Sequence, residues 1–327
     1  MTVALTGVLQ TLASGWPAAA VVNLLERIVP GRPDSLAVLT FHRVTRPGPH
    51  VTPGLLSATP SGFAELLDVL QKRHAVISID DLLRRAGGGP ALPARSVLLT
   101  FDDAYVDFAE HAWPALRERG LPAVLFVPTA YPGEPERAFW WDRVHRAVST
   151  SSRTSVAAPN GEMPLGSAEE RVAAYRSIRD SLKAMPHGAM LEAVDRLVDE
   201  LGGEAAAGLV LDWSTLRALA DEGVALAPHT RTHPLLPRLD PASLDAEIAG
   251  SRDDLARMTG SELPVFAYPS GASSPDVATA VRTAGLQIAF TTARGVNDLR
   301  TSSWHSLRRI NVSVRTPFAA VRAQMVR

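Results

Sequence analysis

The sequence contains no cysteine, which excludes disulfide bonds, zinc–thiolate sites and cysteine nucleophiles. It also lacks an excess of charge of either sign, with 33 Lys and Arg residues against 34 Asp and Glu residues. A balanced chain has no global field to attract it to nucleic acid or to an anionic membrane. We therefore expect no nucleic-acid partner, and any partner must be recognised by a local site.

Long uninterrupted apolar runs are missing as well. The N-terminal stretch is apolar, but Gln10, Ser14 and Pro17 interrupt it. Its first charged residue is Glu26, whereas a secretory signal places basic residues before its apolar run. We expect a packed helix over 18–29, no transmembrane segment and a cytoplasmic location. A peripheral position at the inner membrane surface is the alternative.

Short, nearly continuous apolar runs indicate buried parallel strands. They cover residues 36–41, 75–79, 96–101, 123–127, 224–227, 265–268, 287–291 and 309–314. Helical patterns separate most of them, over 63–73, 109–119, 214–222, 243–259 and 275–284. This alternation predicts βα units around a parallel sheet, and the chain length favours a (β/α) barrel over an open sheet. No glycine-rich fingerprint follows the first strand, which argues against a dinucleotide-binding fold.

One segment breaks the alternation and sets the expected domain organisation. Residues from about 131 to 211 show no clear strand, and helical patterns cover 168–183 and 189–201. We predict an N-terminal helical extension over 1–34 and a barrel domain over 35–327. The barrel domain carries the segment at about 131–211 as a helical insertion.

Two adjacent carboxylates end the predicted strand over 96–101. Asp102 and Asp103 follow it directly, and the carboxyl ends of parallel strands meet at the functional face of α/β folds. Neighbouring residues of a strand point in opposite directions, so one Asp can bind a metal while the other faces a substrate. The alternative is a pair of helix-capping aspartates.

A second strand end carries two histidines, His229 and His233. Pro228 and Pro234 restrict the backbone around them, and a spacing of four can aim both imidazoles at one point. Neutral imidazole suits zinc and related metals, although a structural role is the commoner explanation for such a pair. Two strand ends with potential ligands predict a metal site whose open positions suit hydrolysis.

These segments resemble the motifs of the polysaccharide deacetylase family, the NodB-homology group of metal-dependent carbohydrate esterases. The first is TFDDAY at 100–105 and the second is HTRTH at 229–233. The resemblance extends from about residue 36 to residue 314. It implies a distorted (β/α) barrel of about seven strands.

The resemblance also implies a role for each residue of the two motifs. Asp102 is the implied general base, and Asp103, His229 and His233 are the implied ligands of a divalent metal. A metal-bound water is the nucleophile that removes an acetyl group from an N-acetylated sugar. The backbone N–H of Tyr105 is the candidate that stabilises the oxyanion. Zinc is the expected metal, with cobalt, nickel and manganese as alternatives.

The sequence departs from the family pattern in three places. Ala104 stands where the first motif normally has Gly. The third motif, PVFAYPSG at 264–271, lacks the Arg that normally holds the catalytic Asp. It resembles the form found in the branch that acts on poly-N-acetylglucosamine-like and other surface glycans, and we predict substrate contact for its Tyr268. The last motif, Leu-x-His, is absent, and His305 is nearby but out of pattern.

The general acid therefore has no assigned residue, and His42 is the main candidate. It ends the first predicted strand and should reach the same face, although a structural histidine is equally compatible with this position. The FWWD segment at 139–142 opens the insertion. We expect Trp140 to pack in the core and Trp141 to face a sugar substrate.

The sequence supports a metal-dependent N-deacetylase of an amino-sugar polysaccharide or glycoconjugate. An O-acetyl esterase on acetylated glycans and an inactive carbohydrate-binding relative remain alternatives. A glycosidase is disfavoured, because adjacent Asp102 and Asp103 cannot flank a glycosidic bond. If the enzyme is cytoplasmic, a lipid-linked or nucleotide-linked precursor is the more plausible substrate.

Overall fold

The computed structural model describes residues 18–158 and 161–326. Its main sheet has seven parallel strands in the order β10–β11–β13–β1–β5–β6–β9. Their bounds are β1 (Ser35–Phe41), β5 (Ser96–Phe101), β6 (Val124–Val127), β9 (Ala225–Pro228), β10 (Val265–Ala267), β11 (Ile288–Arg294) and β13 (Leu307–Asn311). The outer strands β9 and β10 lie in contact, and Ser261, shortly before β10, donates from Oγ to the Leu226 carbonyl of β9 at 2.6 Å. The sheet is thus a nearly closed barrel, and the predicted fold class is confirmed.

Alternation along the strands determines which side chains enter the barrel. On β1, Ala37, Leu39 and Phe41 belong to the apolar layer beneath the outer helices, whereas Leu36 and Val38 face the interior cluster. The rings of Phe41 and Phe101 stack at 5.0 Å between centroids. Because β1 and β5 pair in register from Leu36 with Ser96 onward, the two strands end level with each other.

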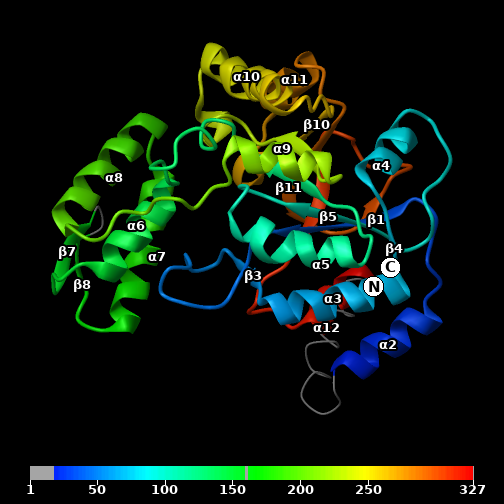
Figure 1. The fold of residues 1–327 in the computed structure, drawn as a ribbon, viewed down its shortest axis with the longest axis horizontal. Coiled ribbons are helices and arrows are strands. Elements are labelled where there is room, and N and C mark those ends of the chain that lie inside the picture. The colour runs from blue at the N-terminus through cyan, green and yellow to red at the C-terminus, as the bar shows by residue number, and fades with distance from the viewer. Residues whose placement is uncertain (1–17, 159–160, 327) are drawn as a thin grey trace.

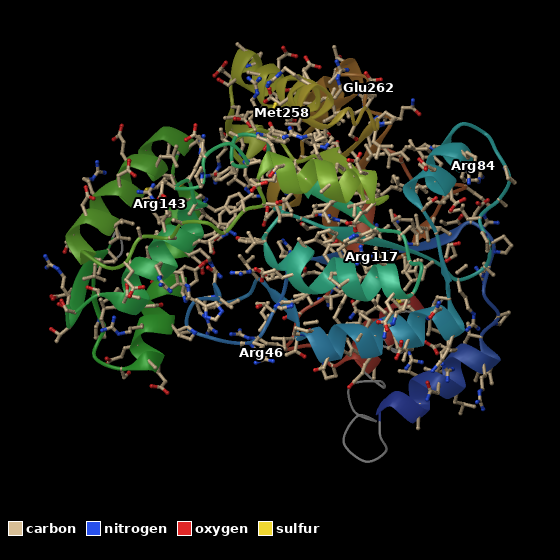
Figure 2. The ribbon with its side chains drawn as sticks, in the orientation of Figure 1. Arg46, Arg84, Arg117, Arg143, Met258 and Glu262 are labelled. Carbon is tan, nitrogen blue, oxygen red and sulfur yellow. The ribbon has the colours of Figure 1, made fainter. Side chains whose placement is uncertain are left out.

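Helices surround the barrel (Figure 1). They are α3 (Pro60–Arg73), α4 (Ile79–Ala86), α5 (Trp113–Glu118), α9 (Trp213–Asp221), α10 (Pro241–Thr259) and α11 (Pro275–Thr283). The sequence predicts all of them except α4, whose first residue, Ile79, falls in the expected strand over 75–79. The pattern over 109–119 is divided, because a π-helical turn, η1 (Phe108–Ala112), precedes α5. Charged side chains on the outer faces, such as Arg84, Arg117 and Glu262, are exposed to solvent (Figure 2).

Residues between β6 and α9 form a group of helices beside the barrel, drawn in green in Figure 1. The helices α6 (Trp140–Thr150), α7 (Ala168–Ala184) and α8 (His187–Leu201) share an apolar cluster of their own. The expectation that this segment has no strand is wrong, because β7 (Ser155–Ala158) and β8 (Gly161–Pro164) form an antiparallel hairpin. A polar hairpin lacks the apolar run that marks a buried strand. We propose that this segment, about 131–211, is an insertion into a barrel domain over 35–327.

Shorter elements complete the described chain. The strands β2 (Arg43–Val44) and β3 (Leu56–Ala58) pair beside the end of β1, while β4 (Ala75–Val76) and β12 (Asn297–Asp298) add to the barrel sheet. Two 3-10 turns, η2 (Leu236–Arg238) and η3 (Pro269–Gly271), follow β9 and β10.

The N-terminal helix α2 (Ala18–Ile28) packs beside the C-terminal helix α12 (Phe318–Met325), as Figure 1 shows. Buried Glu26 on α2 accepts hydrogen bonds from Arg322 of α12 and from Arg73 of α3. Burial alone would raise the pKa of Glu26, but Arg322 lowers it below its ordinary value. The predicted helix over 18–29 is confirmed. The predicted extension over 1–34 stays a proposal, and its residues 1–17 lie outside the described residues.

No helix within 18–158 and 161–326 is long and apolar enough to cross a membrane.

The ion pair of Glu26 predicts a measurable coupling between the two ends of the chain. Glu26→Gln should lower the free energy of unfolding by about 3 kcal/mol, because it leaves the Arg322 charge buried without its partner. Chemical denaturation at neutral pH measures this loss, with exposed Arg27→Gln on the same helix as the control. The difference should shrink as the pH falls below 4.5, the ordinary pKa of Glu, because the unfolded chain then binds a proton at Glu26 before the folded protein does. Equal stability of the parent and Glu26→Gln would contradict the coupling.

Candidate active site

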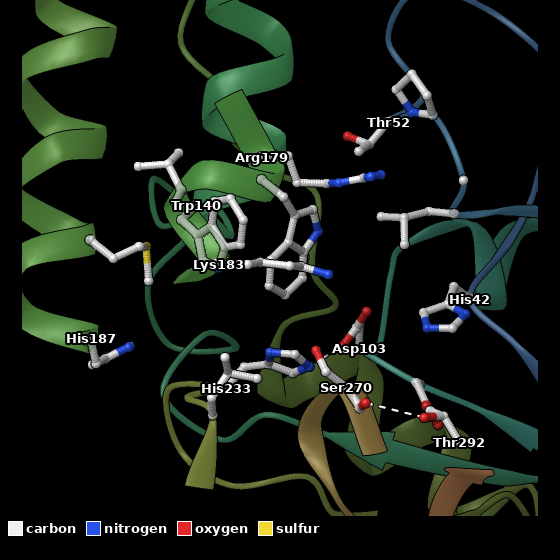
Figure 3. A pocket seen from close by; sticks show the side chains of 18 of the residues that line it. His42, Thr52, Asp103, Trp140, Arg179, Lys183, His187, His233, Ser270 and Thr292 are labelled. Carbon is white, nitrogen blue, oxygen red and sulfur yellow. Dashed lines mark hydrogen bonds and ion pairs between the residues drawn. The ribbon is translucent and has the colours of Figure 1, made fainter. Parts of the chain in front are cut away.

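A pocket of about 400 Å³ opens at the carboxyl ends of the barrel strands. The residues that directly follow three strands line its base: His42 after β1, Asp102 after β5 and His229 after β9. The opposite wall comes from the helices α6, α7 and α8 (Figure 3). The strand ends therefore meet at the pocket, as a parallel barrel predicts.

The structure brings Asp103, His229 and His233 together. Asp103 Oδ1 lies 3.6 Å from His229 Nε2 and 3.5 Å from His233 Nε2. One ligand atom from each residue lies within 4.8 Å of the other two. Asp103 Oδ1 is buried and has no hydrogen-bond partner among the described residues. A buried carboxylate oxygen without a donor is costly, and a cation at this point would compensate it.

The tautomer and charge of the two histidines suit metal binding. His229 Nδ1 lies 2.7 Å from the Ala267 carbonyl oxygen, so Nδ1–H donates and Nε2 faces Asp103 with a free lone pair. Burial lowers the pKa of His229 to about 4 and that of His233 well below its ordinary value. Both rings are therefore neutral at pH 7. Burial, and then the charge of Asp102, raise the pKa of Asp103.

Both loops that carry these residues adopt left-handed backbone conformations. Asp103 has φ 72°, Ala104 φ 50°, Thr230 φ 64° and His233 φ 59°. The Ala at position 104 thus occupies a conformation that Gly adopts without strain, at a cost of about 1–2 kcal/mol. Thr230 Oγ1 accepts a hydrogen bond from the His233 N–H at 3.0 Å and closes the second loop.

Asp102 is held by an arginine that sequence reasoning did not assign. Arg309 of β13 donates from Nη1 and Nη2 to the two carboxylate oxygens of Asp102, each at 2.8 Å. The Arg309 Nε–H donates to the Thr291 carbonyl, which fixes the plane of the guanidinium group. Burial alone would raise the pKa of Asp102, but Arg309 holds it well below its usual range. Asp102 and Asp103 are thus adjacent in the chain, yet the pKa of Asp102 is lowered and that of Asp103 is raised.

The alternation of β13 was the signal that could have identified Arg309. Leu307 and Arg309 are buried, whereas Arg308 between them is exposed. An arginine on the same face as a buried leucine must either pair or stay unsatisfied inside the barrel. The family pattern places this Arg in the third motif, but the strand β10 of that motif contains no basic residue.

The two candidates for the proton donor occupy different places. His42 lines the pocket, and burial lowers its pKa although Asp102 opposes this effect. His305 is not among the residues that line the pocket, and its Nε2 lies 3.0 Å from the Leu286 carbonyl oxygen. Within the described chain, the geometry thus favours His42.

The predicted substrate-side aromatic residues lie at different depths. Trp140 and Trp141 both line the pocket, so the expectation that Trp140 only packs in the core is incomplete. Tyr105 is buried, and its hydroxyl donates to Asp142 at 2.7 Å, so only its backbone could meet a substrate. Tyr268 needs correction as a substrate contact. Its side chain is buried away from the pocket, and its hydroxyl donates to the His305 carbonyl at 3.0 Å.

The chain belongs to the polysaccharide deacetylase family, because the family model described as polysaccharide deacetylase matches residues 89–289. It is thus a member of a family of deacetylase hydrolases, and the resemblance predicted from its two motifs is confirmed. No curated protein matches the chain.

Solved structures share its fold at low sequence identity. A Streptococcus pyogenes deacetylase, PplD, in complex with acetate has a TM-score of 0.60 and 18% identity, over 90% of this chain and 99% of that one. IcaB from Ammonifex degensii has a TM-score of 0.58 and 19% identity, over 90% and 98% of the two chains. A Bacillus cereus polysaccharide deacetylase, BC0361, has a TM-score of 0.58 and 15% identity, over 90% and 70%. At such identities the likeness concerns the fold.

The unpaired oxygen of Asp103 predicts that substitution of this residue affects stability differently with and without metal. Asp103→Asn should leave the metal-free protein at least as stable as the parent, because it removes a buried carboxyl group whose ionisation is disfavoured beside Asp102. Zinc at a hundredfold excess over its dissociation constant should stabilise the parent by about 2.7 kcal/mol but leave the variant unchanged. Thermal unfolding with and without zinc measures both effects, with exposed Asp245→Asn as the control. A full zinc response in Asp103→Asn would exclude this site.

Proposed function

We propose that the protein is a metal-dependent hydrolase that removes acetyl groups from N-acetylated sugars of a polysaccharide or glycoconjugate. One observation carries the proposal. The cluster of Asp103, His229 and His233 lies beside the ionised Asp102 at the base of a pocket. The family match supplies the reaction class, and this cluster supplies the means to perform it.

The cluster fits a divalent cation in donor type, charge and position. Two neutral imidazoles and one carboxylate are the donors that zinc and related metals prefer, and cobalt, nickel or manganese would also be accepted. The buried oxygen of Asp103 without a donor supports the same assignment. When bound, the cation would polarise the acetyl carbonyl and lower the pKa of a water molecule.

Asp102 is positioned to act as the general base. Arg309 keeps its carboxylate ionised, so the carboxylate can accept a proton when water attacks the acetyl carbon. The same ion pair fixes the orientation of the carboxylate, because both oxygens bind one planar guanidinium group. Arg309 thus acts through Asp102, as a positioning residue.

Collapse of the tetrahedral intermediate needs a stabilised oxyanion and a proton for the leaving amine. The backbone N–H of Tyr105 is our candidate donor to the oxyanion, since it lies two residues beyond Asp103 in the same loop. His42 is our candidate for the general acid, because it lines the pocket and faces the charge of Asp102. Trp141 lines the pocket beside His233 and is our candidate to contact the sugar ring.

Acetate release tests the proposed activity directly. The metal-loaded protein should release acetate from N-acetylglucosamine oligomers, and chelation should abolish release until metal is restored. Asp102→Asn should lower kcat by about a hundredfold to ten-thousandfold, because it removes the base.

Acetylated xylan as a second substrate distinguishes N-deacetylation from O-deacetylation. Binding of the oligomers without any release would favour an inactive carbohydrate-binding protein. Activity that survives chelation or Asp103→Ala would overturn the proposal.

The ion pair of Asp102 predicts a shift in the pH profile. Because Arg309 lowers the pKa of Asp102, Arg309→Met should raise that pKa and move the acidic limb of kcat/KM to higher pH. The maximal rate should also fall by about tenfold to a hundredfold, as expected when the support of an active-site group is lost. Arg309→Lys restores the charge but not the bidentate geometry, so it should recover most of the pH shift and little of the rate. An unchanged acidic limb in Arg309→Met would exclude Asp102 as the base.

A further inference from the structure

The wall of the pocket that faces the barrel is unusually rich in positive charge. Arg179 and Lys183 of α7 and Arg238 of η2 all line the pocket. Among the described residues, the carboxylates that line it are those of Asp102 and Asp103 at its base. The pocket thus has an acidic base, where the metal cluster lies, and a basic outer wall.

One face of α7 supplies most of this wall. Tyr175, Arg179, Leu182 and Lys183 all line the pocket, and their spacing of four, seven and eight residues places them on one side of a helix. In Figure 3 the side chains of Arg179 and Lys183 extend from α7 across the pocket, toward the side where His42 and Thr52 lie. Arg176 lies on the same helix but does not line the pocket.

The positive charges of this face are only partly compensated. The Arg179 Nε and Nη2 atoms donate to exposed Asp180 at 2.9 and 2.7 Å, which leaves Nη1 free of this pair. Lys183 forms no ion pair with any described residue, and partial burial followed by the charge of Arg179 lowers its pKa. Arg238 Nη1 donates to the carbonyl oxygens of Lys183 and Met185, and so holds the end of α7 against the barrel loop. An anion between Arg179 and Lys183 would relieve their mutual repulsion.

We propose that this face of α7 binds a phosphate group carried by the acetylated sugar itself. Arg179 and Lys183 would bind the phosphate while the acetyl group lies at Asp103. This inference rests on the proposed function. A neutral glycan offers no negative charge to Lys183 or to the unpaired Nη1 of Arg179, whereas phosphate carries up to two negative charges and is a preferred ligand of both side chains.

The remaining lining residues of this wall agree with a phosphorylated precursor. Trp140, Leu182, Met185 and Met190 form an apolar surface beside the cations. A pocket of about 400 Å³ lies at the small end of the range for ligand sites, which suits one sugar and one phosphate better than a polymer segment. A group beyond the phosphate, either a nucleoside or a lipid chain, would leave along this apolar surface.

Binding measurements on the metal-loaded Asp102→Asn variant test the inference without turnover. Calorimetry compares N-acetylglucosamine 1-phosphate with methyl N-acetylglucosaminide, which share the sugar and differ in the phosphate. The phosphate should strengthen binding by about tenfold to a hundredfold, as expected for charge-assisted hydrogen bonds. Adding Lys183→Gln or Arg179→Gln should remove most of this preference and leave binding of the methyl glycoside within about twofold.

Matched variants separate charge from shape. Arg176→Gln, on the same helix but off the pocket, should keep the full preference for phosphate. Lys183→Arg should keep it too, while Lys183→Glu should reverse it. Lys183 and Arg179 are at least partly exposed, so these substitutions should leave folding intact. Arg238 is not substituted, because its loss would also release the end of α7.

The outcomes distinguish this inference from the proposed activity. Phosphate-dependent binding that Lys183→Gln removes supports the subsite, even if no acetate is released from any substrate. Equal affinity for the two sugars, or a preference that survives both Arg179→Gln and Lys183→Gln, would overturn it, even if the enzyme deacetylates neutral oligomers. The source of the phosphate is identified by comparing the affinities of a nucleotide-diphosphate sugar and of a polyprenyl-diphosphate sugar in detergent micelles. The ligand that binds more tightly shows whether a nucleoside or a lipid chain lies along the apolar surface.

Discussion

The site depends on one ion pair, between Arg309 and Asp102 inside the barrel. Two adjacent carboxyl groups line the base of the same pocket. Because like charges in close proximity repel each other, both groups could not remain ionised there without a compensating cation. Arg309 neutralises Asp102 through two hydrogen bonds and leaves Asp103 without a donor. Two aspartate side chains therefore acquire different chemistry, one as a carboxylate paired with Arg309 and the other as a buried carboxyl group with one oxygen that has no hydrogen-bond donor.

This ion pair makes the site dependent on closure of the barrel. Asp102 directly follows β5, whereas Arg309 lies 207 residues later on β13, with β1 between the two strands in the sheet. The guanidinium group crosses the interior near the ring of Phe126, at 5.9 Å from its centroid. His229 is fixed by the Ala267 carbonyl across the junction of the two outer strands. The last strands to be synthesised thus orient residues of the earlier ones, so the site can form only when the whole barrel has folded.

The parts of the site that could be predicted from sequence are those with local signals. Asp102 and His229 directly follow apolar runs, and Asp103 and His233 lie in the loops that continue from these strand ends, so the parallel fold brings all four together. The roles of Arg309 and Tyr268 were harder to predict, because they depend on which residue each side chain contacts across the barrel. Alternation shows that Arg309 faces inward, but not that its partner is Asp102. Tyr268 follows a strand end as the ligands do, yet its ring turns into the core, where its hydroxyl meets the His305 carbonyl.

The insertion and the barrel make different contributions to one pocket, and electrostatics couples them. The barrel supplies the proposed metal ligands and the proposed general base, while α7 supplies cations that the proposed chemistry does not use. The positive charge of Lys183 also reaches His42, where it adds to the burial that lowers the pKa of that ring. An anion bound at Lys183 would cancel this contribution and favour the protonated form of His42. Burial and the charges of Asp102 and Arg309 nevertheless outweigh Lys183 at His42, so the barrel, more than the insertion, determines the protonation of the residue that we propose as the donor to the leaving amine.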